Sequence, residues 1–167
     1  MGSGTLTVLL PHQMPERIKK VWRQSNYLLT GILLGIGGIV TGILAYFQRL
    51  QGPLIWLVGA WFVLTLGIFF VSQALIGYRY AFHRYEITGE DLAFQAGFIF
   101  RKTTYVPINR IQHVETEQGP FLRRENLMEI VVHTAATNHR LAGLDVAEAL
   151  ALREQIIQLV KVAKEDV

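Results

Sequence analysis

Two long stretches without a charged residue constrain this chain more than any other feature. No Asp, Glu, Lys or Arg lies between Arg23 and Arg49, and none lies between Arg49 and Arg79. Each stretch is longer than the roughly 20 residues that an α-helix needs to cross the hydrocarbon core of a bilayer. The composition agrees, since 51% of the residues are hydrophobic and only 17% are charged. That balance is too apolar for an ordinary soluble domain of this size.

We therefore predict two transmembrane helices, at residues 27–47 and 54–76, joined by a tight turn at residues 48–53 into an antiparallel hairpin. Gly52 and Pro53 are typical turn residues. A cleaved signal peptide fits poorly, because about 26 residues precede the first apolar run and no small-residue cleavage site follows it. Two buried helices of a soluble protein would each need a polar stripe, and neither segment has one.

The distribution of Lys and Arg predicts the orientation of the hairpin. Basic residues precede the first span and follow the second (Arg17, Lys19, Lys20 and Arg23; Arg79 and Arg84). Only Arg49 lies in the connecting turn. The positive-inside tendency therefore places both termini in the cytoplasm, in a multi-pass membrane protein. Neither span contains an ionisable residue, which argues against a channel or a transporter.

Small residues recur along one face of each predicted span. They are Gly31, Gly35, Gly38 and Gly42 in the first span and Ala60, Gly67 and Ala74 in the second. Such stripes let two helix backbones approach closely. We favour packing of the hairpin on itself over contacts with another chain as the use of both stripes.

Residues 1–26 form a basic N-terminal segment, in which residues 15–26 can adopt a short amphipathic helix. Much of the net charge of +3 lies there, because residues 79–167 carry 11 Lys and Arg against 12 Asp and Glu, a net of −1. No nucleic-acid partner is expected from this balance. The candidates for contact with the membrane surface are basic residues in both parts of the chain (Lys19, Lys20, Arg23, Arg101, Lys102, Arg123 and Arg124).

Residues 77–167 change to a pattern of short strands followed by a helix. Aromatic and β-branched segments alternate with turn signals such as Thr88–Asp91 and Gly119–Pro120, and residues 79–88 are expected to be the first strand. The C-terminal residues have helical periodicity, with Asp145 and Glu148 as a capping box. The expected buried stripe of that helix is apolar (Leu152, Ile156, Leu159 and Ala163, widened by Leu150, Ile157 and Val160). We predict six or seven antiparallel strands capped by this helix, the order of elements in a pleckstrin-homology-like (PH-like) barrel.

The stretch from Arg110 to Gln118 gathers one His and two carboxylates. In a regular strand Ile111, His113, Glu115 and Glu117 would share one face. A metal site would need at least three converging ligands, of which His113 and Glu115 offer two and His133 a third. The spacing lacks a compact metal motif, so we interpret the stretch as a patterned strand and expect no metal and no cofactor. Arg110 and Gln112 are then expected to bond neighbouring backbone. Residues 79–167 contain no Ser and no Cys, so no catalytic residue is expected.

The run RKTTYVPINRIQHVETEQGPFLR, followed by LMEIVVHTA and a final amphipathic helix, resembles the YdbS-like bacterial PH-domain membrane proteins. The residues that carry the resemblance are Pro107, Arg110, Ile111, Gln112, Val114, Gln118, Gly119 and Pro120. The resemblance covers roughly residues 15–165 and implies two spans followed by a PH-like domain, in the inner membrane of a bacterium. One departure is Asn126, where the family usually has glycine. Asn is the next best residue for a left-handed backbone, so the turn should form.

Two functions compete for this architecture. We expect a non-enzymatic, membrane-anchored interaction module that assembles with itself or with another membrane protein and takes no small-molecule substrate. The resemblance implies a larger PH-domain membrane protein as partner and a role in tolerating envelope stress. The alternative is a sensor of anionic lipid headgroups. PH domains that bind phosphoinositides grip the phosphates with Lys and Arg in the first hairpin turn. Here that turn is Thr88-Gly89-Glu90-Asp91, which is acidic.

Overall fold

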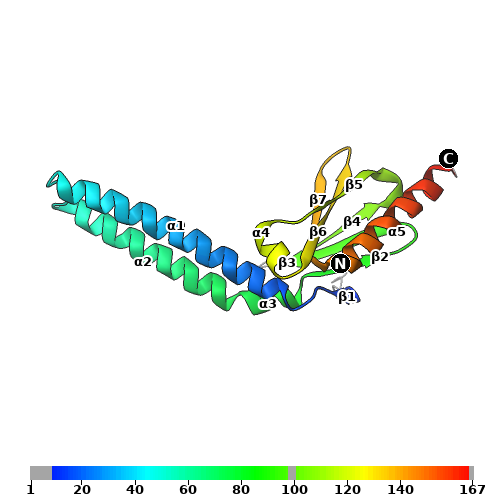
Figure 1. Cartoon of the computed structure of the whole chain (residues 1–167), viewed down its shortest axis with the longest axis horizontal. Helices are drawn as coiled ribbons and strands as arrows, with labels where there is room; N and C mark the ends of the chain where they lie inside the picture. Colours follow the sequence, from blue (N-terminus) through cyan, green and yellow to red (C-terminus); the bar gives the residue numbers. More distant parts are fainter. Residues whose placement is uncertain (1–8, 98–100, 166–167) are drawn as a thin grey trace, which may run out of the picture. The chain divides into compact units, whose positions relative to one another are not determined.

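A computed structural model describes residues 9–97 and 101–165, and its backbone divides into two compact units (Figure 1). The PH unit combines residues 1–20 with residues 77–167, and the hairpin unit consists of residues 21–76. The residues before Lys20 are thus grouped with the C-terminal part of the chain, although the membrane spans separate the two in the sequence.

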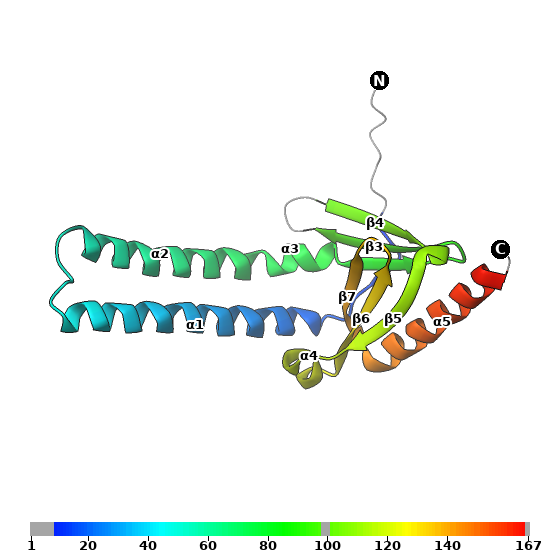
Figure 2. The ribbon, with the colours of Figure 1, turned by 90° about the horizontal axis from the view of Figure 1, so that it is seen from above.

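The hairpin unit consists of two long antiparallel helices, which lie side by side in Figure 2. They are α1 (Ile18–Tyr46) and α2 (Pro53–Ala74). Helix α1 begins at Ile18, so the amphipathic segment and the first span form one continuous helix. Gln48 and Gly52 turn the chain with positive φ angles of 53° and 56°. Pro53 is the first residue of α2, a position where its missing N–H leaves no hydrogen bond unmade.

Both helices have the length and exposure of membrane spans. The candidate spans are Ile18–Tyr46, which is α1, and Pro53–Ala81, which is α2 together with the short helix that follows it. Each contains 29 residues, and only 6% of its most apolar window is buried. The core helix of a soluble protein would instead be mostly buried. Together with the absence of charge, this exposure confirms the prediction of two apolar helices long enough to cross a membrane.

The helices of the hairpin meet at Gly37, not at the predicted glycine stripe. A Cβ atom on Gly37 would lie 2.8 Å from the Trp61 side chain, whose Nε1 donates a hydrogen bond to the Leu33 carbonyl at 3.3 Å. The predicted small residues are all exposed (Gly31, Gly35, Gly38, Gly42, Ala60, Gly67 and Ala74). At each of the five glycines among them, an added Cβ would meet nothing within 4 Å. The prediction that these stripes pack the hairpin on itself is wrong, because they face away from the helix–helix contact.

Two antiparallel sheets form most of the PH unit. One sheet has the order β1-β2-β3-β4, with β1 (His12–Gln13), β2 (Arg84–Ile87), β3 (Asp91–Gly97) and β4 (Arg101–Pro107). The other has the order β5-β6-β7, with β5 (Ile111–Glu117), β6 (Leu127–Thr134) and β7 (Asn138–Asp145). The PH-like order of elements is confirmed. Among the described strands the two sheets share no hydrogen-bonded ladder, so they do not close into a barrel.

Short helices replace two segments that the sequence suggested were extended or irregular. Helix α3 (Ile76–Ala81) occupies the start of the expected first strand, which begins only at Arg84. Helix α4 (Pro120–Arg124) begins at the predicted Gly119–Pro120 turn signal. Asn126 follows it with a φ of 54°, the left-handed conformation predicted for this position. A single 3-10 turn, η1 (Ile108–Arg110), connects the two sheets.

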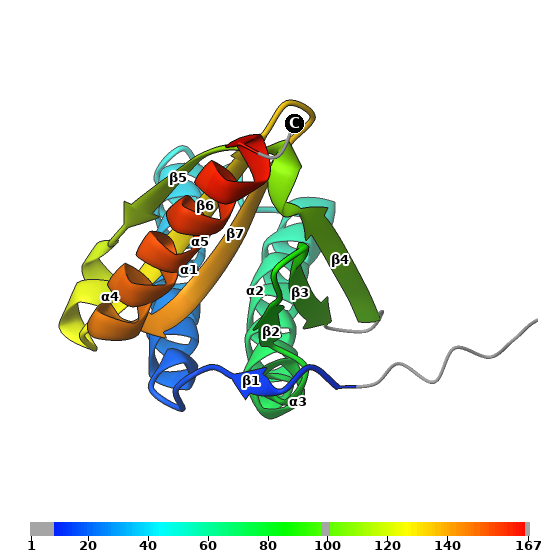
Figure 3. The ribbon, with the colours of Figure 1, turned by 90° about the vertical axis from the view of Figure 1, so that its right-hand side faces the viewer.

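Helix α5 (Val146–Glu165) lies across the β5-β6-β7 sheet, as Figure 3 shows, and contacts all three strands. Its buried stripe is narrower than predicted. Ala149 and Ile156 are fully buried and Leu152 nearly so, whereas Leu150 is 45% exposed. The remaining predicted members, Leu159 among them, are partly exposed. They lie in the last turns of the helix, beyond the positions that reach the sheet core.

The segment before α1 completes the PH unit. Strand β1 pairs with β2, and the side chains of Met14 and Ile18 are each 1% exposed. The Tyr80 hydroxyl donates a hydrogen bond to the Met14 carbonyl at 2.8 Å, and Arg17 forms an ion pair with Asp145, the last residue of β7. These contacts tie residues 10–18 to strands and helices that follow the membrane hairpin.

Candidate functional site

The family-motif segment is held in place by two buried isoleucines. Pro107 ends β4, and the η1 turn follows. Ile108 is 1% exposed, and its N–H donates to the Glu90 carbonyl at 2.9 Å. Ile111 is 2% exposed at the start of β5. Because both anchors point inward, the residues between and after them are displayed at the surface.

These displayed residues line a groove of about 620 Å³, here called the motif groove. Its lining mixes apolar and hydrogen-bonding side chains (Thr104, Tyr105, Val106, Pro107, Asn109, Arg110, Ile111, Gln112, Thr134, Ala135, Ala136, Thr137 and His139). One wall is the turn between β6 and β7. Thr134 fixes that turn, because its N–H and its hydroxyl both donate to the Thr137 carbonyl, at 3.0 and 2.7 Å.

Arg110 and Gln112 do not bond neighbouring backbone as predicted. Both side chains are exposed, and neither makes a hydrogen bond or ion pair within the described part of the chain. Gln118 does have a structural role, because its Nε2 donates to the Leu127 carbonyl at 2.9 Å. Gly119 precedes α4, whose first residue is Pro120. The motif therefore contains both structural residues and residues that are free to contact a ligand.

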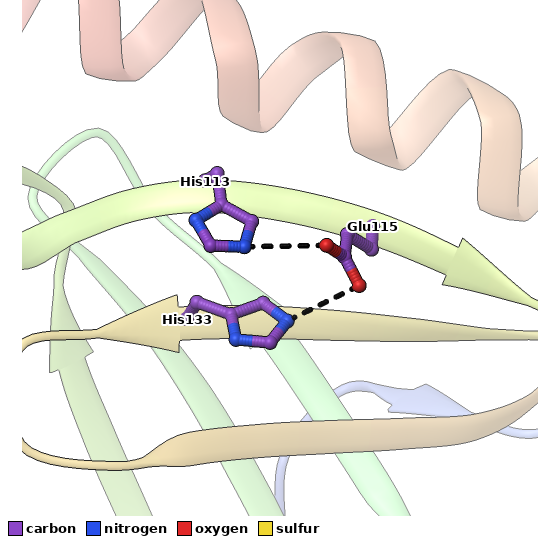
Figure 4. A group of neighbouring side chains, drawn as sticks. All are labelled: His113, Glu115 and His133. Carbon is purple, nitrogen blue, oxygen red and sulfur yellow. Dashed lines mark ion pairs between the residues drawn. The ribbon is translucent and has the colours of Figure 1, made fainter.

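A second group of polar side chains lies on β5 and β6. We call His113, Glu115 and His133 the His–Glu–His cluster (Figure 4). The imidazole rings stack with centroids 4.1 Å apart and planes inclined by 12°. Nε2 of His113 lies 3.3 Å from Glu115 Oε1, and Nε2 of His133 lies 3.4 Å from Glu115 Oε2. Both rings thus direct the same nitrogen at one carboxylate.

A register shift in β5 brings the two histidines of the cluster together. Ile111 pairs with Thr134, but His113, two residues later, pairs with His133, so one extra residue is accommodated between them. Without the shift, Gln112 would lie opposite His133. The same irregularity explains why Ile111 is buried while His113 is exposed. The predicted regular alternation from Ile111 to Glu117 is therefore wrong at its first residue, since bulges re-aim side chains.

Next to the cluster, Arg140 neutralises the neighbouring carboxylates. Its Nη1 lies 2.9 Å from Glu117 Oε2 and 3.6 Å from Glu129 Oε2. Burial raises the pKa of Glu129, and the Arg140 charge opposes that rise. Glu115 has a different environment: in the described part of the chain no Lys or Arg pairs with it, and its ionic partners are the two imidazoles.

The residues proposed to contact the membrane surface differ in whether their side chains already have a partner within the chain. Lys19 lies 3.0 Å from Glu16 Oε1 and 4.0 Å from the centroid of the Tyr80 ring. Lys20 lies 3.8 Å from Glu125 Oε2. The side chains of four others are exposed (Arg23, Lys102, Arg123 and Arg124). The Arg101 side chain lies outside the described residues.

Two exposed apolar helices joined to a pair of antiparallel sheets and a C-terminal helix define a membrane protein with a PH-like domain. Comparison with known proteins agrees with this class. The model of the family described as "Bacterial PH domain" matches residues 15–160. The transmembrane protein YdbS of Bacillus subtilis (strain 168) is 32% identical over 154 residues, which cover 89% of this chain and 91% of the relative. The chain belongs to the bacterial PH domain family, and it is a homologue of YdbS. No solved structure matches it.

Three features of these sites do not follow from local sequence patterns. The N-terminal strand β1 is only two residues long. The second wall of the motif groove comes from residues 134–137, far from the motif in the sequence. The sequence offered His133 as a possible third ligand, but its position opposite His113 is set by the pairing of β5 with β6. The only local sequence pattern that pointed to the His–Glu–His cluster was the imidazole of His113 two residues before the carboxylate of Glu115.

Proposed function

We propose that this protein is a non-enzymatic interaction module, anchored in the bacterial inner membrane, whose motif groove binds another protein. The observation that carries the proposal is the exposure of Arg110 and Gln112, which have no hydrogen-bond partner within the described chain. A guanidinium and an amide together offer several donors and an acceptor. Placed beside exposed apolar surface such as Tyr105, which is 62% exposed, they match the mixed character of protein interfaces.

The shape of the groove also favours a peptide or protein segment as the ligand. Ala135 and Ala136 are exposed, and their small side chains leave room above one wall of the groove. Phosphoryl or acyl transfer would need a nucleophile and a base in the same place. The hydroxyl groups of the lining belong to Thr104, Tyr105, Thr134 and Thr137. The imidazole of the lining is His139, which stacks on Phe94 with ring centroids 5.9 Å apart. This geometry supports binding better than chemistry.

Lipid-headgroup sensing is the alternative function, and the acidic β2–β3 turn argues against it. Thr88 closes that turn, since its hydroxyl accepts from the Asp91 N–H at 3.0 Å. Glu90 remains exposed beside it and would repel a phosphate. Lys19 and Lys20 have acidic partners of their own, Glu16 and Glu125, which leaves less charge for the membrane surface.

The partner we propose is a second copy of this chain or a larger PH-domain membrane protein. The exposed stripe from Gly31 to Gly42 supports assembly within the membrane, since small residues allow close helix approach. We propose tolerance of envelope stress, which the family resemblance implies, as the process that such a complex serves. Both termini then lie in the cytoplasm, as the Lys and Arg distribution indicates. Cysteines placed at Gln51 and Asn138 test this orientation: only the first should react with an impermeant label in intact cells.

Co-purification tests the binding function. The full-length chain, extracted from native membranes in mild detergent, should retain a second copy or another membrane protein. Ala136→Arg places a bulky cation in the groove wall and should abolish retention. Ala151→Arg is the matched control, because Ala151 is also exposed but lies on α5 outside the groove lining. Equal retention by both variants, or no retained protein with the wild type, would contradict the proposal.

A further inference from the structure

We infer that the His–Glu–His cluster is a binding site for a divalent transition-metal ion, and that Zn²⁺ is the ion it fits best. His113, Glu115 and His133 each offer one ligand atom, and these atoms all lie within 4.8 Å of one another. Two imidazole nitrogens with one carboxylate oxygen form a ligand set that proteins use for zinc with an open fourth position.

The distances within the cluster match a single ion. Zinc bonds to imidazole nitrogen at about 2.0–2.1 Å and to carboxylate oxygen at about 2.0–2.2 Å, so two ligand atoms of a tetrahedral site lie about 3.3–3.5 Å apart. The nitrogen–oxygen distances here are 3.3 Å for His113 and 3.4 Å for His133. The two distances go to different oxygens of Glu115, and one ligand atom from each residue lies within 4.8 Å of the others. Side-chain rotations of Glu115 and of the two imidazoles can therefore bring the three ligand atoms around one ion.

The environment of His133 Nε2 supports a ligand at this place. This atom is buried and makes no hydrogen bond, although it lies within 3.4 Å of Glu115 Oε2. The approach is close enough for an ionic contact, but its direction does not suit a hydrogen bond. A buried polar atom is rarely left without a partner. A metal ion between the imidazole and the carboxylate would supply one for both.

The sheet holds the three ligands rigidly. His113 and Glu115 are two residues apart on β5 and project from the same face, and His133 is the direct cross-strand partner of His113. Cross-strand neighbours have Cβ atoms about 4.5–5.5 Å apart, which sets the imidazoles side by side. The register shift before His113 is what creates this pairing. Ligands placed on paired strands keep their separation better than ligands on loops.

The ligand chemistry selects the class of metal. Imidazole nitrogen suits zinc, copper, nickel and iron, whereas Mg²⁺ and Ca²⁺ prefer all-oxygen sites. Only one carboxylate is available here, because Arg140 pairs with both Glu117 and Glu129. The side chains of His113 and Glu115 are 55% and 52% exposed. Water can therefore reach the ion and complete its coordination.

Metal titration of the full-length protein tests this inference. The chain would be purified in detergent, freed of any affinity tag and of metal, and titrated with ZnCl₂ by calorimetry. We expect saturable binding of one Zn²⁺ per chain that excess MgCl₂ does not displace. His113→Gln, Glu115→Gln and His133→Gln should each weaken binding by about tenfold or more, since each removes one ligand. Glu117→Gln and His12→Gln are the matched controls, since His12 is exposed and lies outside the cluster and the groove lining, and both should bind Zn²⁺ as the wild type does.

Thermal unfolding separates loss of the site from loss of the fold. A ligand that binds only the folded chain raises its thermal midpoint. Zn²⁺ should raise the midpoint of the wild type and of both control variants, and should leave the midpoints of the three ligand variants unchanged. The midpoint of each variant with Zn²⁺ is compared with its own midpoint without Zn²⁺, so a variant that is less stable overall is not mistaken for one that has lost the site. The inference is overturned if the wild type shows no saturable Zn²⁺ binding, or if the ligand variants bind as tightly as the controls.

Discussion

Gly143 on β7 lies directly against Ile18 at the start of α1. Its φ angle is 102°, and a Cβ atom there would lie 2.7 Å from Ile18 Cδ1. Glycine is therefore required twice at this position, once by the backbone and once by the neighbouring side chain. The contact joins the residues before the membrane hairpin to the last strand of the PH unit, so the hairpin is inserted into a domain formed by both flanks.

Gly143→Ala should destabilise the PH unit by roughly 2–4 kcal/mol, from the positive φ together with overpacking against Ile18. Thermal unfolding of the full-length protein measures this, with Gly89→Ala as control, because a Cβ at Gly89 meets nothing within 4 Å. In the double variant with Ile18→Ala, part of the loss should be recovered relative to the sum of the single changes. Strict additivity would show that the two residues are not in contact.

Gly37→Leu and Gly35→Leu should affect different properties of the hairpin: the first its stability, the second its assembly with another helix. A side chain at residue 37 collides with Trp61, so the first change should lower the stability of the hairpin by about 1–3 kcal/mol. Residue 35 faces open space, so the second should leave the hairpin intact and weaken only assembly with another helix. Unfolding in increasing SDS measures the former, and sedimentation in mild detergent the latter. Equal loss of hairpin stability in both variants would contradict this packing.

Ile156→Asp should destabilise the PH unit by about 3 kcal/mol or more, because it buries a carboxylate without a partner. Ile156 is fully buried. Leu150→Asp on the same helix is the control and should change stability by less than about 0.5 kcal/mol, since residue 150 is 45% exposed. The thermal midpoint of each variant is the measurement. Comparable midpoints would mean that α5 does not pack against the sheet through Ile156.

His83 should make the PH unit less stable in mild acid. Burial lowers its pKa, the nearby Arg79 charge lowers it further, and the hydrogen bond to the Ala142 carbonyl at 3.1 Å only partly offsets them. Below about pH 6.5 the His83 imidazole is therefore protonated in the unfolded chain while it is still largely neutral in the folded chain. Stability contributed by neutral His83 is therefore complete above that pH and is lost as the pH falls toward the folded pKa.

His83→Gln should flatten this dependence, because glutamine keeps an N–H donor but does not ionise in this range. The midpoint difference between about pH 7.5 and about pH 5.5 should shrink in the variant. His12→Gln, at an exposed position, should keep the wild-type difference. An unchanged pH dependence in His83→Gln would assign the acid sensitivity to another group.

Features encoded by neighbouring residues were predictable from the sequence. The absence of charge from Gln24 to Gln48 is enough to identify a span, since spanning depends on length and polarity alone. The residue type at position 126, an asparagine, was enough to predict the left-handed turn there. The glycine stripe was misassigned because periodicity shows which residues share a helix face, but not what that face contacts. Gly37, which does meet Trp61, stands outside the regular spacing.

Features that depend on register or on distant segments were not predictable. Residues 10–18 belong to the PH unit because they pair and pack with β2, α3 and β7, which follow the membrane hairpin in the sequence. The pairing of His113 with His133 depends on one extra residue in β5, which alters no local pattern. The groove likewise needs the Thr134–Thr137 turn to approach the motif from another hairpin.

Photo-crosslinking from the motif groove shows directly whether the groove binds another protein. The full-length chain would carry p-benzoylphenylalanine in place of Tyr105, which lines the groove and is 62% exposed. Irradiation of native membranes, followed by mass spectrometry, identifies what is attached. Position 151 on α5 serves as the control. We expect an adduct with a second copy or with another membrane protein from position 105 and none from position 151. Phospholipid adducts alone at position 105 would contradict it and favour a sensor of lipid headgroups.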